Sequence, residues 1–242
     1  VYKMLDSIAN QSYTDFVVHA NIPIFSDLEE RVYEIPEQWN EYSFLELYRT
    51  KDYGSFTKLY PTLKRMKDKE QPIITIDDDI IYHEDMIKEF IKADKRNKQQ
   101  CALAFVGVHN TKGKTSEGGS MFWGPVKEDT EVEIIEGYKG ALYRKKYFDM
   151  EQYKKALGIY WCDDTVHSKL LEINKVKRIV CHYEKEINFT PRVEAFPFMA
   201  HISMPKSGIK KRMEEDKELG RLDRSMMQTF KKVVAIVRLE EL

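Results

Sequence analysis

The sequence predicts an α/β protein whose largely parallel central sheet is covered by helices. Short apolar, β-branched runs that are typical of buried strands, such as 72–76 and 101–106, recur along the chain. Between them lie segments of helical periodicity, such as 84–93 and 163–173. Strands that alternate with helices in this way favour a layered α/β architecture with a largely parallel sheet.

The other elements follow from the same periodicities and from turn residues. In chain order we expect a helix over 2–10, a strand over 16–22, a turn at 52–55, a short helix over 56–63 interrupted at Pro61, a strand over 72–76, a helix from 84, strands over 101–106 and 131–136, a helix from 163, a strand over 178–183 and a helix over 219–237. The stretches 107–125 and 203–212 are predicted to be loops that can move as flaps.

We expect a single domain over residues 1–242, with a C-terminal flap and helix in 203–242. The helical pattern begins almost at the first residue. We therefore expect a first strand upstream of it to be missing from this sequence, as it would be in part of a longer chain.

Composition excludes several classes of protein. The 242 residues carry 39 basic and 40 acidic side chains, and this balance gives no basic excess for binding nucleic acid. No apolar run is long enough to span a bilayer, and no signal peptide opens the chain. Cys101, Cys162 and Cys181 are widely spaced and form no C-x-x-C pair. We therefore expect a cytoplasmic protein with no transmembrane segment and no nucleic-acid partner.

The strongest local signal is Asp77-Asp78-Asp79, which directly follows the strand at 72–76. Adjacent carboxylates repel one another unless a cation neutralises them. The carboxyl edge of an open α/β sheet is also where ligands bind. A hard divalent cation with a bound diphosphate is the simplest neutraliser. The alternative is an acidic loop that caps the next helix.

Several segments together resemble the nucleotide-sugar glycosyltransferases of the GT-A fold, particularly the large family 2 group. They are Leu5 to Tyr13 (first-helix pattern), Asp52 to Lys58 (glycine turn and basic residue), Ile74 to Tyr82 (aspartate motif) and Trp161 to Asp164 (acidic pair that opens a helix). The resemblance covers roughly residues 2–175 and implies a Rossmann-like α/β/α sandwich. It departs from the family pattern in lacking the first strand, in having lysine for arginine at Lys58, and in lacking the Gln-x-x-Arg-Trp motif of processive synthases.

The resemblance also implies roles at the donor. Asp78 would hold the ribose, and Asp79 would ligate a Mn²⁺ or Mg²⁺ ion that bridges the diphosphate of a UDP-sugar. Asp77 would stand behind these ligands or be an alternative ligand. Lys58 would contact the same diphosphate, or else be a solvated helix lysine. Asp52 would contact the nucleotide, or else form an Asx turn. His201 would supply a late metal ligand, although a lone histidine is more often structural.

On the acceptor side, the resemblance makes Asp163 or Asp164 the catalytic base of an inverting transfer. Both could instead simply cap the helix. The family's glycine-marked turn corresponds to Gly137-Tyr138-Lys139-Gly140. The aromatic residues Tyr138, Trp123 and Trp161 are candidate platforms for stacking sugars, or else core residues. The basic segment 206–212 would close over the diphosphate, or else be a solvated charge run.

The sequence therefore predicts a metal-dependent hexosyl- or pentosyltransferase that moves a sugar from a nucleotide-sugar to a glycan or other hydroxyl acceptor with inversion. Three alternatives remain open at this point. They are a retaining transferase on the same fold, a sugar-phosphate nucleotidyltransferase, whose Gly-rich loop is not present, and a non-catalytic module that binds carbohydrate or a partner.

Overall fold

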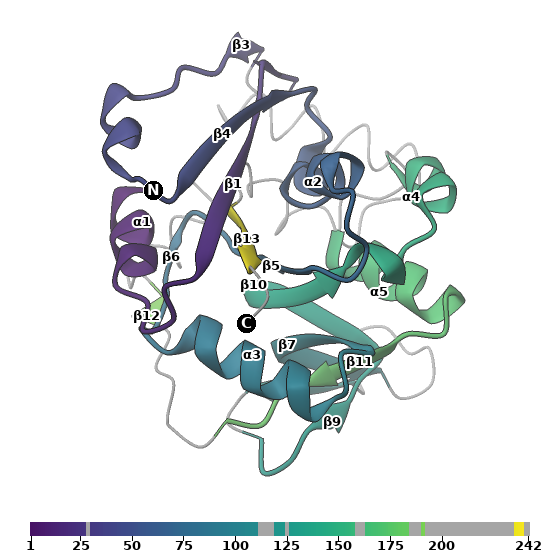
Figure 1. The fold of residues 1–242 in the computed structure, drawn as a ribbon. Helices are drawn as coiled ribbons and strands as arrows, with labels where there is room; N and C mark the ends of the chain where they lie inside the picture. Colours follow the sequence, from purple (N-terminus) through teal and green to yellow (C-terminus); the bar gives the residue numbers. More distant parts are fainter. Residues whose placement is uncertain are drawn as a thin grey trace.

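The computed structural model of the chain describes residues 1–27, 30–110, 119–123, 126–157, 163–183, 190–191 and 235–239 (Figure 1). The helices in this part of the chain are α1 (Tyr2–Ala9), α2 (Tyr60–Arg65), α3 (Met86–Arg96), α4 (Met150–Ala156) and α5 (Asp163–Ile173), with 3-10 turns η1 (Glu37–Glu41), η2 (Gly54–Lys58) and η4 (Lys145–Tyr147). The strands are β1 (Phe16–Pro23), β2 (Phe25–Ser26), β3 (Arg31–Val32), β4 (Leu45–Thr50), β5 (Pro72–Thr75), β6 (Ile80–Ile81), β7 (Cys101–Asn110), β8 (Gly119–Trp123), β9 (Thr130–Glu131), β10 (Ile134–Arg144), β11 (Lys177–Val180), β12 (Thr190–Pro191) and β13 (Ala235–Leu239). The predicted α/β class is confirmed.

A nine-stranded sheet forms the centre, in the order β4-β1-β13-β5-β10-β7-β11-β9, with β8 paired to β7. β1 pairs in parallel with β4, and β7 pairs in parallel with β11, whereas the other neighbours are antiparallel. It follows that β4, β1, β5, β7 and β11 share one direction, and β13, β10, β9 and β8 run the other way. The sheet is therefore mixed. Most of its strands run in one direction, in line with the predicted largely parallel sheet, but most pairs of neighbouring strands are antiparallel.

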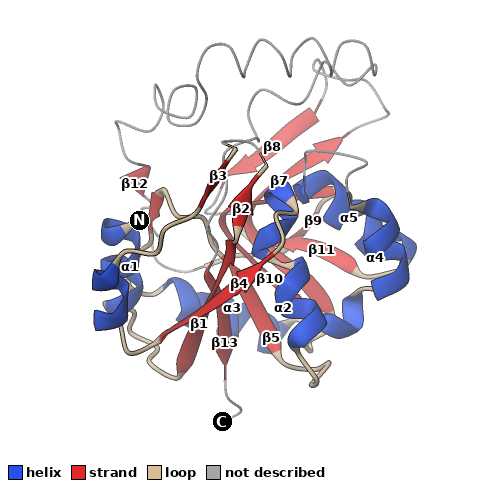
Figure 2. Cartoon of the chain, turned by 90° about the horizontal axis from the view of Figure 1, so that it is seen from above, coloured by secondary structure: helices blue, strands red, loops and turns tan. Residues whose placement is uncertain are grey.

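Helices cover both faces of this sheet. α1 and α3 lie on one side, and α2, α4 and α5 lie on the other (Figures 1 and 2). The arrangement follows from the alternation of side chains along each strand, because successive residues point to opposite faces. Ile74 and Leu142 join the core beneath α1 and α3, and their neighbours Ile73 and Tyr143 join the core beneath α2, α4 and α5.

Four predicted elements differ in the structure. The strand predicted at 101–106 continues to Asn110 and pairs with β8, so the loop predicted over 107–125 is shorter. The strand predicted at 131–136 is two strands, β9 and β10, with different partners. The predicted turn over 137–140 lies within β10, where the register against β7 shifts between Glu136 and Ala141. Residues 235–237, the end of a predicted helix, lie in strand β13.

Among the described residues, no helix combines the length and the apolar character that crossing a membrane requires.

Candidate active site

Seven of the predicted site residues meet at one edge of the sheet. β4 and β5 run in the same direction, so the residues that follow them, Asp52 and 77–79, lie at the same edge. β10 runs antiparallel to β5 and begins at this edge. Helix α5 begins with Asp163 and Asp164, and its contacts with β10 bring these two carboxylates to the end of β5. Lys58, at the end of η2, joins them.

The Lys58 ammonium lies between two carboxylates. Its Nζ is 3.2 Å from Oδ1 of Asp77 and 2.7 Å from Oδ2 of Asp163. The exposed fractions of the three side chains are 1%, 0% and 2%, so the cluster is closed to solvent. Burial would lower the pKa of Lys58, but the charges of Asp163, Asp77 and Asp164 raise it well above its usual value. Lys58 is therefore a permanently charged, buried ammonium ion.

The turn before η2 delivers Lys58 to this place. Gly54 has a φ of 58°, a left-handed conformation that glycine adopts without strain. Asp52 fixes the same turn, because its Oδ1 accepts the Gly54 N–H at 2.8 Å and its Oδ2 accepts the Asp27 N–H at 3.1 Å. This is the Asx turn that was the alternative for Asp52, and a contact from Asp52 to a nucleotide stays a prediction.

Asp164 is held differently from its neighbour Asp163. Its Oδ1 accepts the backbone N–H of Gly137 at 3.1 Å, and its side chain is buried. A Cβ at Gly137 would lie 2.9 Å from this Oδ1 and 3.9 Å from Lys58 Nζ. Only a glycine therefore lets β10 approach the carboxylate this closely. The glycine that the sequence placed in an acceptor-facing turn instead supports a carboxylate from within a strand.

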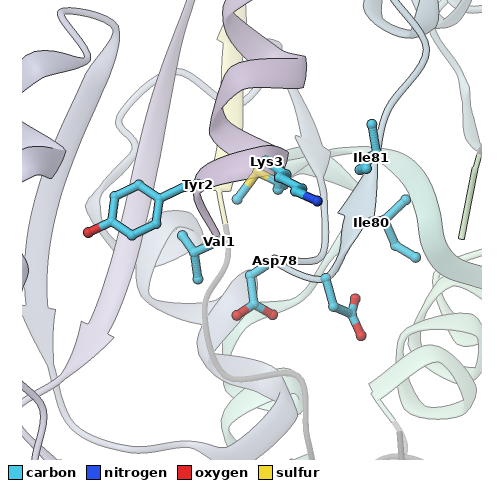
Figure 3. A pocket seen from close by; sticks show the side chains of 8 residues that line it. Val1, Tyr2, Lys3, Asp78, Ile80 and Ile81 are labelled. Atoms are coloured by element: carbon cyan, nitrogen blue, oxygen red, sulfur yellow. The ribbon is translucent and has the colours of Figure 1, made fainter. Parts of the chain in front are cut away.

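Asp78 and Asp79 are partly buried and line a cavity of about 260 Å³ together with the first residues of α1 and with β6. Figure 3 shows Asp78 beside Val1, with Tyr2, Lys3, Ile80 and Ile81 around the same space. Burial, followed by the charges of Asp79 and Asp77, raises the pKa of Asp78 to about 7. A carboxylate whose ionisation is opposed by neighbouring carboxylates is a place where a bound cation would be stabilised.

Among the described residues, no three His, Cys, Asp or Glu side chains converge closely enough to hold a metal ion by themselves. A cation held by the described carboxylates alone would take its remaining ligands from elsewhere, for example from the phosphate oxygens of a substrate. That is the usual mode for Mg²⁺, which binds through one or two carboxylates and the phosphates of the substrate. The two carboxylates beside the cavity fit such an ion.

Two features of the site were not predicted. Tyr82 is buried, and its hydroxyl accepts the Asp77 N–H at 2.7 Å and donates to the Tyr138 carbonyl at 3.1 Å, so it joins the aspartate motif to β10. His167, one turn after Asp163, hydrogen-bonds the Tyr153 hydroxyl inside an aromatic cluster. The only signal for Tyr82 was its place directly after Ile80-Ile81 in the aspartate motif, and we found none for His167.

The remaining candidates divide into two groups. Tyr138 lies in β10, partly buried against the core beneath α1 and α3, and Trp123 lies in β8. His201, Trp161 and the basic segment 206–212 lie outside the described residues.

Comparison of the sequence with protein-family models and with curated proteins gives no match. The function therefore has to be inferred from the residues themselves and from their geometry.

Proposed function

We propose that this chain is a GT-A-fold glycosyltransferase of the family 2 type. It would transfer a sugar from a nucleotide-sugar, most simply a UDP-sugar, to a hydroxyl group of a glycan or glycoconjugate, with inversion. One observation carries the proposal: the aspartate motif, the acidic pair of α5 and Lys58 meet at one sheet edge, beside a cavity lined by Asp78 and Asp79. The helices on both faces of the sheet support the GT-A assignment.

On the donor side, Asp78 and Asp79 would hold a Mn²⁺ or Mg²⁺ ion or the ribose, and the donor's phosphates would complete the coordination. When bound, the cation would neutralise negative charge that develops on the leaving nucleoside diphosphate. The apolar side chains that line the cavity, among them Met4 and Ile80, suit the nucleoside portion of such a donor.

On the acceptor side, different groups contact the two aspartates of α5. The ammonium of Lys58, 2.7 Å from Asp163, favours the ionised form of that carboxylate, which opposes its taking up a proton. Asp164 accepts a neutral backbone N–H, that of Gly137. We therefore assign the base to Asp164. It would take the proton of the acceptor hydroxyl as that oxygen attacks the anomeric carbon and the diphosphate leaves from the opposite face.

The proposal includes a reducing, cytoplasmic location. Cys101 and Cys181, the two cysteines among the described residues, are buried free thiols.

The test is a transfer assay with a panel of UDP-, GDP- and dTDP-sugars in the presence of Mn²⁺, with the product analysed by proton NMR. We expect donor consumption that requires a divalent cation and stops on chelation, and an anomeric coupling opposite to that of the donor. Retained configuration would contradict the inverting mechanism. If no nucleotide-sugar is consumed and none stabilises the chain against heat, the transferase assignment is wrong, and a non-catalytic binding module becomes the better description.

A further inference from the structure

The geometry of Lys58 departs from its predicted role. A lysine that neutralises a diphosphate has to present its ammonium to the cavity. Here the ammonium is 1% exposed and is engaged by carboxylates from two separate elements, the end of β5 and the start of α5. These are the two elements that carry the donor-side and acceptor-side groups of the proposed transferase.

Stability alone does not explain this arrangement. A buried ion pair is often no more stable than apolar side chains of the same volume, because removing both charges from water offsets their attraction. In this cluster one ammonium ion bridges Asp77 and Asp163, which come from two separate elements, and the charge of Asp164 also acts on it. Such a group is better suited to fixing the geometry of the carboxylates than to stabilising the fold.

The residues that follow Asp77 and Asp163 in the chain are the groups whose positions the Lys58 bridge would fix. Asp77 is followed directly by Asp78 and Asp79, which line the cavity. Asp163 is followed directly by Asp164, whose carboxylate is bound by the Gly137 N–H. Each partner of Lys58 thus precedes the group that would act on a substrate, so a shift of the ammonium would move both groups relative to each other.

We propose that Lys58 is a positioning residue: it bridges Asp77 and Asp163 and so sets the separation between the donor-binding end of β5 and the base-bearing start of α5. The inference rests on the proposed transferase function and deepens it. It differs from the sequence-based prediction, in which Lys58 contacts the donor diphosphate directly. The two roles give opposite expectations for donor affinity.

The experiment compares Lys58→Met with the wild-type chain by calorimetry with UDP and Mn²⁺ and by steady-state transfer kinetics. If Lys58 positions the two sides, kcat should fall about 100-fold, the typical consequence of misplacing reacting groups by about 1 Å. The Kd for UDP should stay within about threefold, because each side alone still forms. Adding Asp163→Asn should lower kcat no further than the more severe single variant does, since both changes break the same bridge.

Arg144→Met is the matched control. It also removes a buried cation paired with an aspartate, but at the opposite end of β5, where Arg144 pairs with Pro72. It should destabilise the fold and leave kcat of the folded protein unchanged. If Lys58→Met does not fold, the double variant Lys58→Met with Asp163→Leu replaces it in the experiment, because it removes one charge of each sign. The expected kcat and Kd for UDP are the same as for Lys58→Met.

Three outcomes would overturn the proposal. A Kd for UDP that weakens in proportion to kcat would mean a direct contact with the diphosphate. An unchanged kcat in folded protein would mean a purely structural ion pair. A wild-type chain that neither binds UDP nor transfers sugar would contradict the proposed function itself, and the positioning role with it. The wild-type measurement thus separates failure of the function from failure of the inference.

Discussion

Two buried clusters of opposite charges lie in the part of the chain that the structure describes, and they are built differently. Arg144 and Asp94 form a closed pair: the guanidinium donates to both carboxylate oxygens at 2.6 Å and to the Glu70 carbonyl at 2.6 Å. One positive charge meets one negative charge, and the planar fork satisfies both oxygens. At the other end of β5, Lys58 is shared by Asp77 and Asp163, with Asp164 close enough to act on its pKa.

Under the proposed function, the two clusters use buried charge for different ends. The Arg144 pair is balanced and joins α3 to β10, so it behaves as part of the core. In the Lys58 cluster one ammonium ion is shared by carboxylates from two elements, next to a cavity lined by two more carboxylates. Clusters of interacting buried titratable groups beside a cavity are candidate functional sites. The predictions below test this contrast, beginning with the largest effect.

Asp164→Asn should lower kcat by about 10²- to 10⁴-fold, the usual contribution of a general base, with donor affinity nearly unchanged. Transfer kinetics and UDP calorimetry on the same preparation measure both effects. Asp149→Asn is the matched control, because Asp149 also stands at a helix start and its side chain accepts the Glu151 and Gln152 N–H groups. Equal kinetic effects of the two variants would show that Asp164 is only a helix cap.

Asp94→Asn should lower the free energy of unfolding by about 3–5 kcal/mol, because it leaves the Arg144 charge buried without its partner. Urea denaturation measures the loss. Glu131→Gln breaks the exposed pair with Lys177 and should leave stability nearly unchanged. The contrast between the two clusters would be wrong if Asp94→Asn impaired transfer by the folded protein as strongly as Asp164→Asn does.

The smallest expected effect concerns pH and His167, which lies beside the Lys58 cluster. Burial lowers the pKa of His167 from 6.5 to about 4; the charge of Asp163 opposes this shift, and that of Lys58 adds to it. A depressed folded-state pKa contributes stability that is present above pH 6.5 and is lost as the pH falls towards 4. Over that window the free energy of unfolding should fall by about 3 kcal/mol through this residue.

His167→Gln removes that titration and keeps a polar group near the Tyr153 hydroxyl. Urea denaturation at pH 7 and at pH 4.5 should therefore show a smaller drop in stability for the variant than for the wild-type chain. Equal drops would mean that folding leaves the pKa of His167 unshifted.

Much of the fold could be predicted because its elements have strong local patterns. The runs that became β5, α3 and α5 are apolar at the right period, and their boundaries agree within a few residues. Strand β4 was missed because it is a sheet edge whose side chains are exposed or only partly buried, so no apolar run marks it. The long strand β10 was divided because Gly137 and Gly140 are typical of a turn. Gly140, with a φ of 99°, instead sits in the register shift within the strand.

The residues of the candidate site could be predicted from the sequence, but their arrangement in space could not. The aspartate motif and the acidic pair were identifiable because carboxylates after a strand or at a helix start are conspicuous. Which carboxylate faces Lys58 and which faces Gly137 depends on how α5 packs against β10, a long-range contact that no local pattern encodes. The role of Tyr82, which joins the motif to β10, was missed for the same reason.

The central claim is that the carboxylates after β5 form a metal-dependent nucleotide site, and isothermal calorimetry with UDP and Mn²⁺ tests it most directly. The wild-type chain should bind UDP only when Mn²⁺ is present, and Asp79→Asn should abolish this binding while the fold stays intact. Asp15→Asn, an exposed carboxylate that precedes β1 at the opposite edge of the sheet, should bind as the wild-type chain does. Unchanged affinity in Asp79→Asn, or UDP binding that ignores Mn²⁺, would contradict the claim.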